Sequence, residues 1–143
     1  MNTEELVINT KSKSDKITEA NQYMLESGGI KTFIYSKALK ERIFPKLPNI
    51  KNISNLMLDE VGKYSITLPK TAEIITKLIK NHIDNNNELK NKEIIITDAT
   101  AGIGGNTISF GQSFSKVNAI EINYNRFLFL QNNIKIYSLD NVT

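Results

Sequence analysis

The sequence of 143 residues contains no cysteine. It therefore has no disulfide bonds, no thiolate ligands for a metal ion and no thiol nucleophile, which suits a reducing compartment. The amino terminus lacks the charged and apolar regions of a signal peptide, and no apolar run is long enough to cross a bilayer. These absences predict a soluble, intracellular protein without a membrane partner.

Neither sign of charge dominates the chain. Its 18 basic and 15 acidic residues give a formal net charge of +3, and no segment is a basic arm. The charge balance permits binding to nucleic acid and does not argue for it. The single histidine, His82, falls on a predicted helix without a second ligand or a nucleophile nearby. We therefore expect a solvated or packing histidine and no metal site.

Composition and patterning divide the chain into three segments. A hydrophobic content of 40% and a charged content of 23% are typical of soluble globular proteins, and the length suits one domain. Residues 1–30 are polar and predict a poorly ordered or loosely helical arm. Residues 31–68 predict a mainly helical and irregular segment, here called the preface segment. Residues 69–143 predict the start of an α/β domain.

Within the preface segment, apolar residues at three- and four-residue spacing predict an amphipathic helix over residues 31–44, ended by Pro45 and Pro48. The following stretch is irregular, and short extended pieces are expected over residues 53–58 and 63–67. A second helix should begin at Pro69 and end in the asparagine run at residues 85–87.

The apolar pattern then changes its period. The β-branched run at residues 93–98 predicts a strand buried on both faces. Glycines interrupt this run, a helix can open at Asn106, residues 117–122 form a second apolar run, and helical spacing resumes over residues 127–137. This order is typical of a parallel α/β unit, so the two strands should be adjacent and parallel, with a right-handed crossover.

The turn after the first of these strands carries the candidate ligand site. Residues 98–106 read Asp-Ala-Thr-Ala-Gly-Ile-Gly-Gly-Asn, and such closely spaced glycines allow a tight turn and a close approach to a ligand. The helix that follows offers free N–H groups to a carboxylate. Asp98 ends the strand, where a carboxylate favours an ammonium group. Glu121 ends the second strand and can accept both hydroxyl protons of a ribose diol.

Two rival interpretations of this turn stay open. A nicotinamide or flavin dinucleotide fingerprint needs glycine or alanine at position 107, which is Thr107 here. An acid four residues before the first glycine is instead the arrangement of methyltransferases, whose loop holds no pyrophosphate. The second rival is a glycine turn with a purely structural role.

Residues 35 to 142 resemble the trimethylguanosine synthase family, the RNA-cap guanine-N2 methyltransferases of the class I fold. The similar stretches are Arg42-Ile-Phe44, Leu58-Asp-Glu60, Tyr64-Ser-Ile-Thr67, Asp98-Ala-Thr-Ala-Gly-Ile-Gly-Gly-Asn-Thr-Ile-Ser-Phe110, Val117-Asn-Ala-Ile-Glu-Ile122 and Gln131-Asn-Asn-Ile-Lys-Ile-Tyr137. The resemblance implies a Rossmann-like sheet, incomplete in this chain, with S-adenosylmethionine as cofactor and capped RNA as partner. The implied cofactor-binding residues are Asp98, Thr100, Gly102, Gly104, Gly105, Asn106 and Glu121.

The sequence departs from this family in two places. The family's Thr-Pro-Glu reads Thr67-Leu-Pro-Lys70 here, with an added residue and a base in place of the acid. The family's Asp-Pro-Pro-Trp-Gly-Gly segment, which holds the guanine and its amine, does not occur in this sequence. The acid that follows the family's third strand is also absent. That third strand should begin near Asn141. We therefore assign no catalytic residue, and expect no methyl transfer to capped RNA by these 143 residues alone.

Three functions are compatible with these observations. The chain is the amino-terminal part of a cap guanine-N2 methyltransferase, part of another class I methyltransferase acting on RNA, DNA or protein, or a shortened relative that serves as a binding or interaction module. In each case a partner chain or a missing carboxyl-terminal half should complete the sheet, because an open sheet of two strands is marginally stable.

Overall fold

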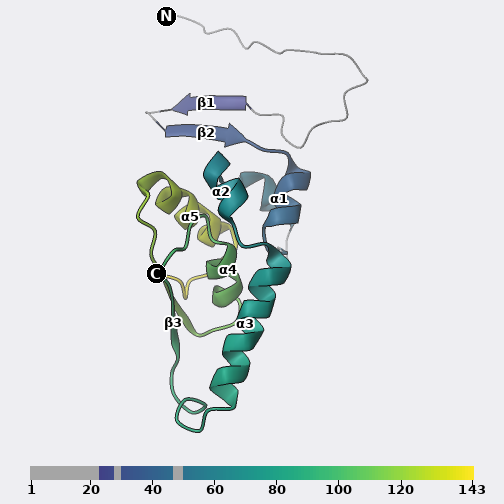
Figure 1. The fold of residues 1–143 in the computed structure, drawn as a ribbon. Coiled ribbons are helices and arrows are strands. Elements are labelled where there is room, and N and C mark those ends of the chain that lie inside the picture. Colours follow the sequence, from purple (N-terminus) through teal and green to yellow (C-terminus); the bar gives the residue numbers. More distant parts are fainter. Residues whose placement is uncertain (1–22, 28–29, 47–49) are drawn as a thin grey trace, which may run out of the picture.

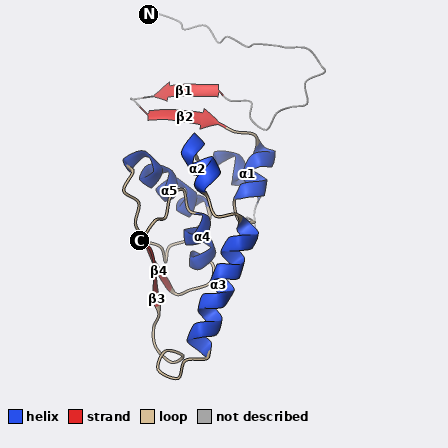
Figure 2. Ribbon diagram, viewed as in Figure 1, coloured by secondary structure: helices blue, strands red, loops and turns tan. Residues whose placement is uncertain are grey.

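The computed structural model describes residues 23–27, 30–46 and 50–143 of the chain. One long helix, α3, runs along a group of shorter helices, and a hairpin lies at the far end of the molecule from the short parallel sheet (Figures 1 and 2). The elements in chain order are β1 (Tyr23–Ser27), β2 (Ile30–Ile34), α1 (Lys37–Ile43), the 3-10 helix η1 (Ile50–Asn55), α2 (Glu60–Ser65), α3 (Pro69–Asp84), β3 (Ile95–Asp98), α4 (Gly105–Gly111), β4 (Lys116–Ala119) and α5 (Tyr124–Ile136).

Two antiparallel strands occupy Tyr23–Ser27 and Ile30–Ile34, where the sequence predicted an arm and the start of a helix. Strand β1 pairs with β2, so that Tyr23 lies opposite Ile34 and Ser27 lies opposite Ile30. The β-branched and aromatic residues of β2 favour this extended pairing. The prediction of a loosely helical arm is therefore wrong for Tyr23–Ser27, and residues 1–22 and 28–29 of that arm lie outside the described residues.

Two short helices with side-chain N-caps lie in the preface segment, and their bounds differ from the elements that the sequence predicted there. Helix α1 begins only at Lys37, because the Ser36 hydroxyl caps it by accepting the Leu39 N–H at 3.2 Å. The extended pieces predicted over residues 53–58 and 63–67 are wrong, since η1 and α2 cover most of them. Asp59 caps α2 by accepting the Gly62 N–H at 2.6 Å.

The predicted parallel α/β unit is confirmed. Strands β3 and β4 are adjacent and parallel, with Asp98 opposite Ala119, and α4 connects them. Both strands are shorter than predicted, so Glu121 lies two residues beyond the end of β4. A parallel bridge joins Val117 to Val142, which places the start of a third strand where the sequence predicted it.

Helix α3 begins at Pro69 and ends at Asp84, as predicted, with Asn85 as its C-cap. Its proline stands in the first turn, where the missing N–H has no intrahelical partner to lose. Among the described residues, no helix combines the length and the apolar character that a bilayer span requires.

The preface segment and the α/β unit share one hydrophobic core. Phe44 from the preface segment and Phe129 from α5 are at most 1% exposed, and Ile103 from the glycine-rich loop packs with them. The core beneath the glycine-rich loop is therefore formed by residues that lie far apart in the sequence. Ile103 anchors the loop to this core, so the position of the loop depends on the preface segment.

The prediction that the first strand is buried on both faces is wrong. Ile95 of β3 is 49% exposed, and Thr97 is exposed as well. Along α3, Ile74 and Leu78 are also at least half exposed. The described residues therefore leave apolar side chains of β3 and α3 uncovered.

Candidate cofactor-binding site

The loop between β3 and α4 needs glycine for two different reasons. Gly102 and Gly104 have φ values of +56° and +108°, in the left-handed region that other residues rarely adopt. Gly105 has an ordinary backbone conformation, but a Cβ there would lie 2.7 Å from the Thr67 carbonyl oxygen. The start of α4 thus meets the backbone of the preface segment at a distance that only glycine permits.

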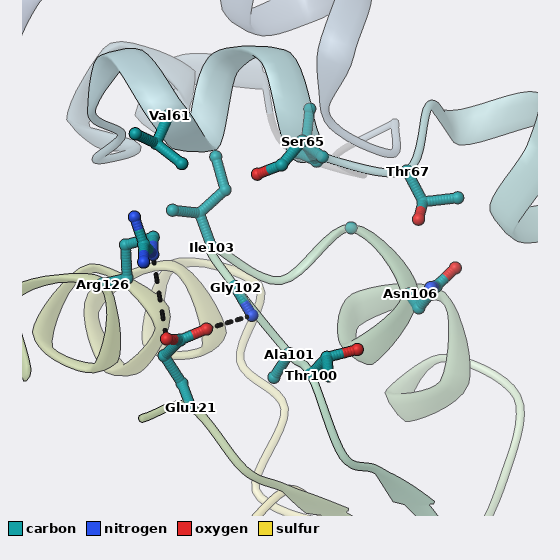
Figure 3. Close-up of a pocket in the computed structure, with 12 residues that line it drawn as sticks. Val61, Ser65, Thr67, Thr100, Ala101, Gly102, Ile103, Asn106, Glu121 and Arg126 are labelled. Carbon is teal, nitrogen blue, oxygen red and sulfur yellow. Dashed lines mark hydrogen bonds and ion pairs between the residues drawn. The ribbon is translucent and has the colours of Figure 1, made fainter. Parts of the chain in front are cut away.

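A pocket of about 360 Å³ lies between this loop and the preface segment (Figure 3). Helix α2 and the turn after it form one wall, and the loop with the start of α4 forms the opposite wall. Glu121 and Arg126 close one end of the pocket. The predicted site residues that line it are Thr100, Gly102, Gly105, Asn106 and Glu121.

Asp98 and Gly104, also predicted site residues, do not line this pocket. Asp98 is only 7% exposed, and its Oδ2 accepts the Thr107 hydroxyl at 2.6 Å. Its Oδ1 lies 3.4 Å from the Thr100 amide nitrogen. Asp98 therefore ties the start of the loop to the first turn of α4 from beneath.

Asn106 presents an acceptor that the protein leaves unused. Its Oδ1 is buried and has no hydrogen-bond partner among the described residues. Most buried side-chain polar atoms are hydrogen-bonded, because an unsatisfied one loses its solvation without compensation. Asn106 lines the pocket, and this oxygen is the one buried side-chain acceptor of the described residues that has no partner.

Glu121 is held in position by the protein itself. Its Oε2 accepts the Gly102 N–H at 2.8 Å, and its Oε1 accepts the Asn123 N–H at 2.7 Å. Its side chain is 8% exposed. Each carboxylate oxygen can accept more than one hydrogen bond, so these contacts leave capacity for ligand hydroxyls.

Arg126 connects Glu121 to the preface segment. Its Nε lies 3.7 Å from Glu121 Oε1, and its Nη1 lies 3.4 Å from Asp59 Oδ2. Asp59 is also the N-cap of α2, so one guanidinium fixes the acid in the pocket and the helix across from it. The sequence analysis missed Arg126, and the only local signal is an opposite charge five residues after Glu121.

A buried amide links the loop to the preface segment on the core side. Asn133 of α5 is fully buried, and its Oδ1 accepts the Met57 N–H at 2.8 Å. Its Nδ2 donates to the carbonyl oxygens of Met57 and Ile103, each at 2.9 Å. Ile103 belongs to the glycine-rich loop, so this single side chain fixes loop and preface segment together.

The turn that departs from the family pattern still reaches the pocket. Ser65, Ile66 and Thr67 line it, and Val61 of α2 does too. The added residue, Leu68, is half exposed, and the turn brings Pro69 to the start of α3. The extra residue therefore leaves the wall of the pocket in place.

The remaining sequence predictions concern histidine and metal. His82 is exposed near the end of α3 and does not line the pocket. In the described ranges, no group of three or more His, Cys, Asp or Glu side chains is placed to hold a metal ion.

Comparison with known families identifies the class of the α/β unit. Residues 93–143 match the RNA cap guanine-N2 methyltransferase family, and this stretch contains β3, the glycine-rich loop, Glu121 and α5. The predicted resemblance to this family is confirmed over these residues. The same match supports S-adenosylmethionine as the cofactor.

One curated relative and one solved structure are similar over longer stretches. The uncharacterized protein L320 of Acanthamoeba polyphaga mimivirus is 34% identical over 120 residues, which is 73% of this chain and 46% of that protein. The chain thus spans about half the length of this curated relative. The crystal structure of M. jannaschii TYW2 in complex with AdoMet matches with a TM-score of 0.37 and 19% identity, covering 90% of this chain and 44% of that chain.

Proposed function

We propose that this chain is the cofactor-binding part of an S-adenosylmethionine-dependent methyltransferase that acts on RNA. The acceptor that the family suggests is the N2 amine of a cap guanine. The observation that carries the proposal is the pocket between α2 and the loop, because five of the seven predicted cofactor-binding residues line it: Thr100, Gly102, Gly105, Asn106 and Glu121. These are the positions at which the family resemblance places the cofactor.

The chemistry of the pocket fits this cofactor. Glu121 offers carboxylate oxygens to the two ribose hydroxyls, and the unused Oδ1 of Asn106 offers an acceptor to the methionine ammonium group. Asn106 takes this second role instead of Asp98, because the Asp98 oxygens already accept from Thr100 and Thr107, whereas Asn106 Oδ1 has no partner among the described residues. When bound, S-adenosylmethionine supplies the electrophilic methyl group.

Arg126 and Asn133 act as positioning residues in this proposal. Arg126 keeps the Glu121 carboxylate facing the pocket, and its contact with Asp59 keeps α2 over the opposite wall. Asn133 holds the loop carbonyl of Ile103 from the core side. The pocket is therefore shaped by contacts within the chain, which lowers the ordering cost of binding a ligand.

Calorimetric titration of the chain with S-adenosylmethionine tests the proposal. Glu121→Gln should bind about 10- to 100-fold more weakly, because charge-assisted hydrogen bonds contribute about 1.5–3 kcal/mol. Glu93→Gln, at an exposed acid outside the pocket, should change the affinity by less than about twofold, as expected for a surface substitution. Equal affinities of the two variants would contradict the ribose assignment.

A second variant separates ligand contacts from loop stability. Glutamine at position 121 would place an amide near the N–H donors of Gly102 or Asn123, so Glu121→Gln also loosens the loop. Asn106→Ala removes an acceptor without a protein partner, so it should weaken cofactor binding about 10- to 100-fold, as for one hydrogen bond of about 1.5–3 kcal/mol to a charged group. Its thermal midpoint should stay at the wild-type value. Unchanged affinity would remove Asn106 from the site.

A further inference from the structure

A second concavity runs beside the cofactor pocket, between α3 and α4. This groove of about 640 Å³, here called the α3 groove, has four lysines among its lining residues. Lys70, Lys77 and Lys80 belong to α3, where spacings of seven and three residues place them on one face of the helix. Lys46, from the segment after α1, adds a fourth ammonium group from a separate part of the chain.

Most of this positive charge is not neutralised locally. Glu73 is the single acid lining the groove, and it forms an ion pair with Lys77 at 2.6 Å. Lys46, Lys70 and Lys80 make no ion pair with any residue that the structure describes. An excess of three ammonium groups therefore lines one groove.

The other wall and the floor of the groove are formed by uncharged polar side chains. Ser109, Gln112 and Ser113 line it from α4 and the residues after it. Thr76 and Ser109 share a hydrogen bond of 2.7 Å and are both buried, so the floor is satisfied without a ligand. No aromatic side chain lines the groove, and a base would find no surface on which to stack.

The groove begins where the cofactor pocket ends. Thr67 lines the pocket and Pro69 lines the groove, only two residues later. On the facing helix, Asn106 lines the pocket and Ser109 lines the groove, so α4 contributes to both. The two concavities therefore have neighbouring residues of the same turn and of the same helix in their walls.

We propose that the α3 groove binds the phosphate backbone of a single RNA strand and leads it to the cofactor pocket. From Lys70 to Lys80 the charges extend about 15 Å along the helix axis, at 1.5 Å per residue, so they suit an extended polyanion rather than one phosphate ion. The choice of RNA rests on the proposed function. Since contacts to phosphates carry no base information, binding should be independent of sequence.

Fluorescence anisotropy with a labelled single-stranded RNA of about 20 nucleotides, recorded on the full chain over a salt series, tests this proposal. Each phosphate contact contributes about 0.7 to the slope of log affinity against log salt for single strands. The double variant Lys70→Gln/Lys80→Gln should therefore bind about 25-fold more weakly at about 0.1 M salt, with a slope shallower by about 1.4. The matched control, Lys92→Gln/Lys116→Gln, removes two exposed lysines outside the groove and should change the affinity less than about twofold.

Three results would overturn the groove assignment. These are the absence of RNA binding, equal weakening by the two double variants, and displacement of the RNA by millimolar inorganic phosphate at constant ionic strength. Titration with S-adenosylmethionine separates this proposal from the proposed function. Lys70→Gln/Lys80→Gln should keep wild-type cofactor affinity and thermal midpoint while losing RNA. A wild-type chain that binds RNA through the groove but not the cofactor would contradict the proposed function alone.

Discussion

Two regions of this molecule are packed very differently. Where the preface segment meets α5 and the glycine-rich loop, Phe44, Ile103 and Phe129 are at most 1% exposed. Along α3 and β3, Leu78 and Ile95 are 63% and 49% exposed, although both are large aliphatic residues. The first region, called the closed core below, is as buried as a protein interior, whereas the apolar residues of the second, called the open side, are left uncovered by the described residues.

The contrast separates two parts of the α/β unit, the candidate cofactor pocket and the sheet. The candidate cofactor pocket is backed by the closed core, so residues within this chain are enough to shape it. The sheet is different. Within the described residues, β3 has β4 as its one neighbouring strand, and apolar side chains of β3 and α3 are left uncovered. This arrangement fits the expectation that a partner chain or further residues complete the sheet.

Truncating a side chain in each region should produce the largest difference. Phe44→Ala in the closed core should lower the free energy of unfolding by about 3–5 kcal/mol, because it removes a fully buried ring and leaves a cavity. Leu78→Ala on the open side should lower it by less than about 0.5 kcal/mol. Urea unfolding followed by circular dichroism measures both. Similar losses for the two variants would show that the regions are not distinct.

A smaller effect is expected from the amide that links the closed core to the pocket. Asn133→Leu should destabilise the chain by about 2–4 kcal/mol, because it leaves the Met57 N–H and the Met57 and Ile103 carbonyls without partners. It should also weaken cofactor binding, since Ile103 belongs to the loop.

The neighbouring residue provides the control for this prediction. Asn132→Leu removes contacts to the Asn55 carbonyl and to the side chain of Asn133, and it should cost less than about 1.5 kcal/mol. Chemical unfolding and calorimetric titration of the two variants check both properties. A loss of stability at Asn133 with unchanged cofactor affinity would confine its role to the core.

The sequence predicted those parts of the fold whose signals are local. The change of period before Ile95, the glycines after Asp98 and the proline at position 69 each act within a few residues, and β3, β4, the loop and α3 followed from them. The lengths were less accurate, because strand ends depend on which residues find a partner. Glu121 was predicted at a strand end and lies beyond it for this reason.

The contacts that finish the pocket could not be predicted, because they join distant segments. Arg126 meets Asp59 across 67 residues, and Asn133 meets Met57 across 76 residues. No pattern in either stretch indicates its partner. The direction of Asp98 was equally hidden, since a strand-end acid can face a ligand or, as here, the underside of its own loop.

The smallest predicted effect concerns Lys40, which is the one buried lysine among the residues that the structure describes. Lys40 is 5% exposed, and its Nζ donates to the Ser54 carbonyl at 2.5 Å. Burial lowers the pKa of this ammonium below its ordinary value, because a charged group loses hydration there. Between the lowered pKa and the ordinary lysine value of about 10.4, the unfolded chain binds more protons than the folded one. The free energy of unfolding should therefore rise with pH in this window.

Two tyrosines oppose this trend at higher pH. Burial raises the pKa of Tyr35 and Tyr137, so above about pH 10 the folded state retains protons that the unfolded state loses, and stability should fall. Lys40→Met should abolish the rise in the free energy of unfolding below about pH 10 and keep its fall at higher pH. The control Lys37→Met, at a half-exposed lysine paired with Glu41, should keep both the rise and the fall. Urea unfolding between pH 7 and 11 distinguishes them. If the Lys40→Met curve runs parallel to the wild-type curve throughout, the ammonium of Lys40 is hydrated, and the closed core is more open to water around Ser54 than its packing indicates.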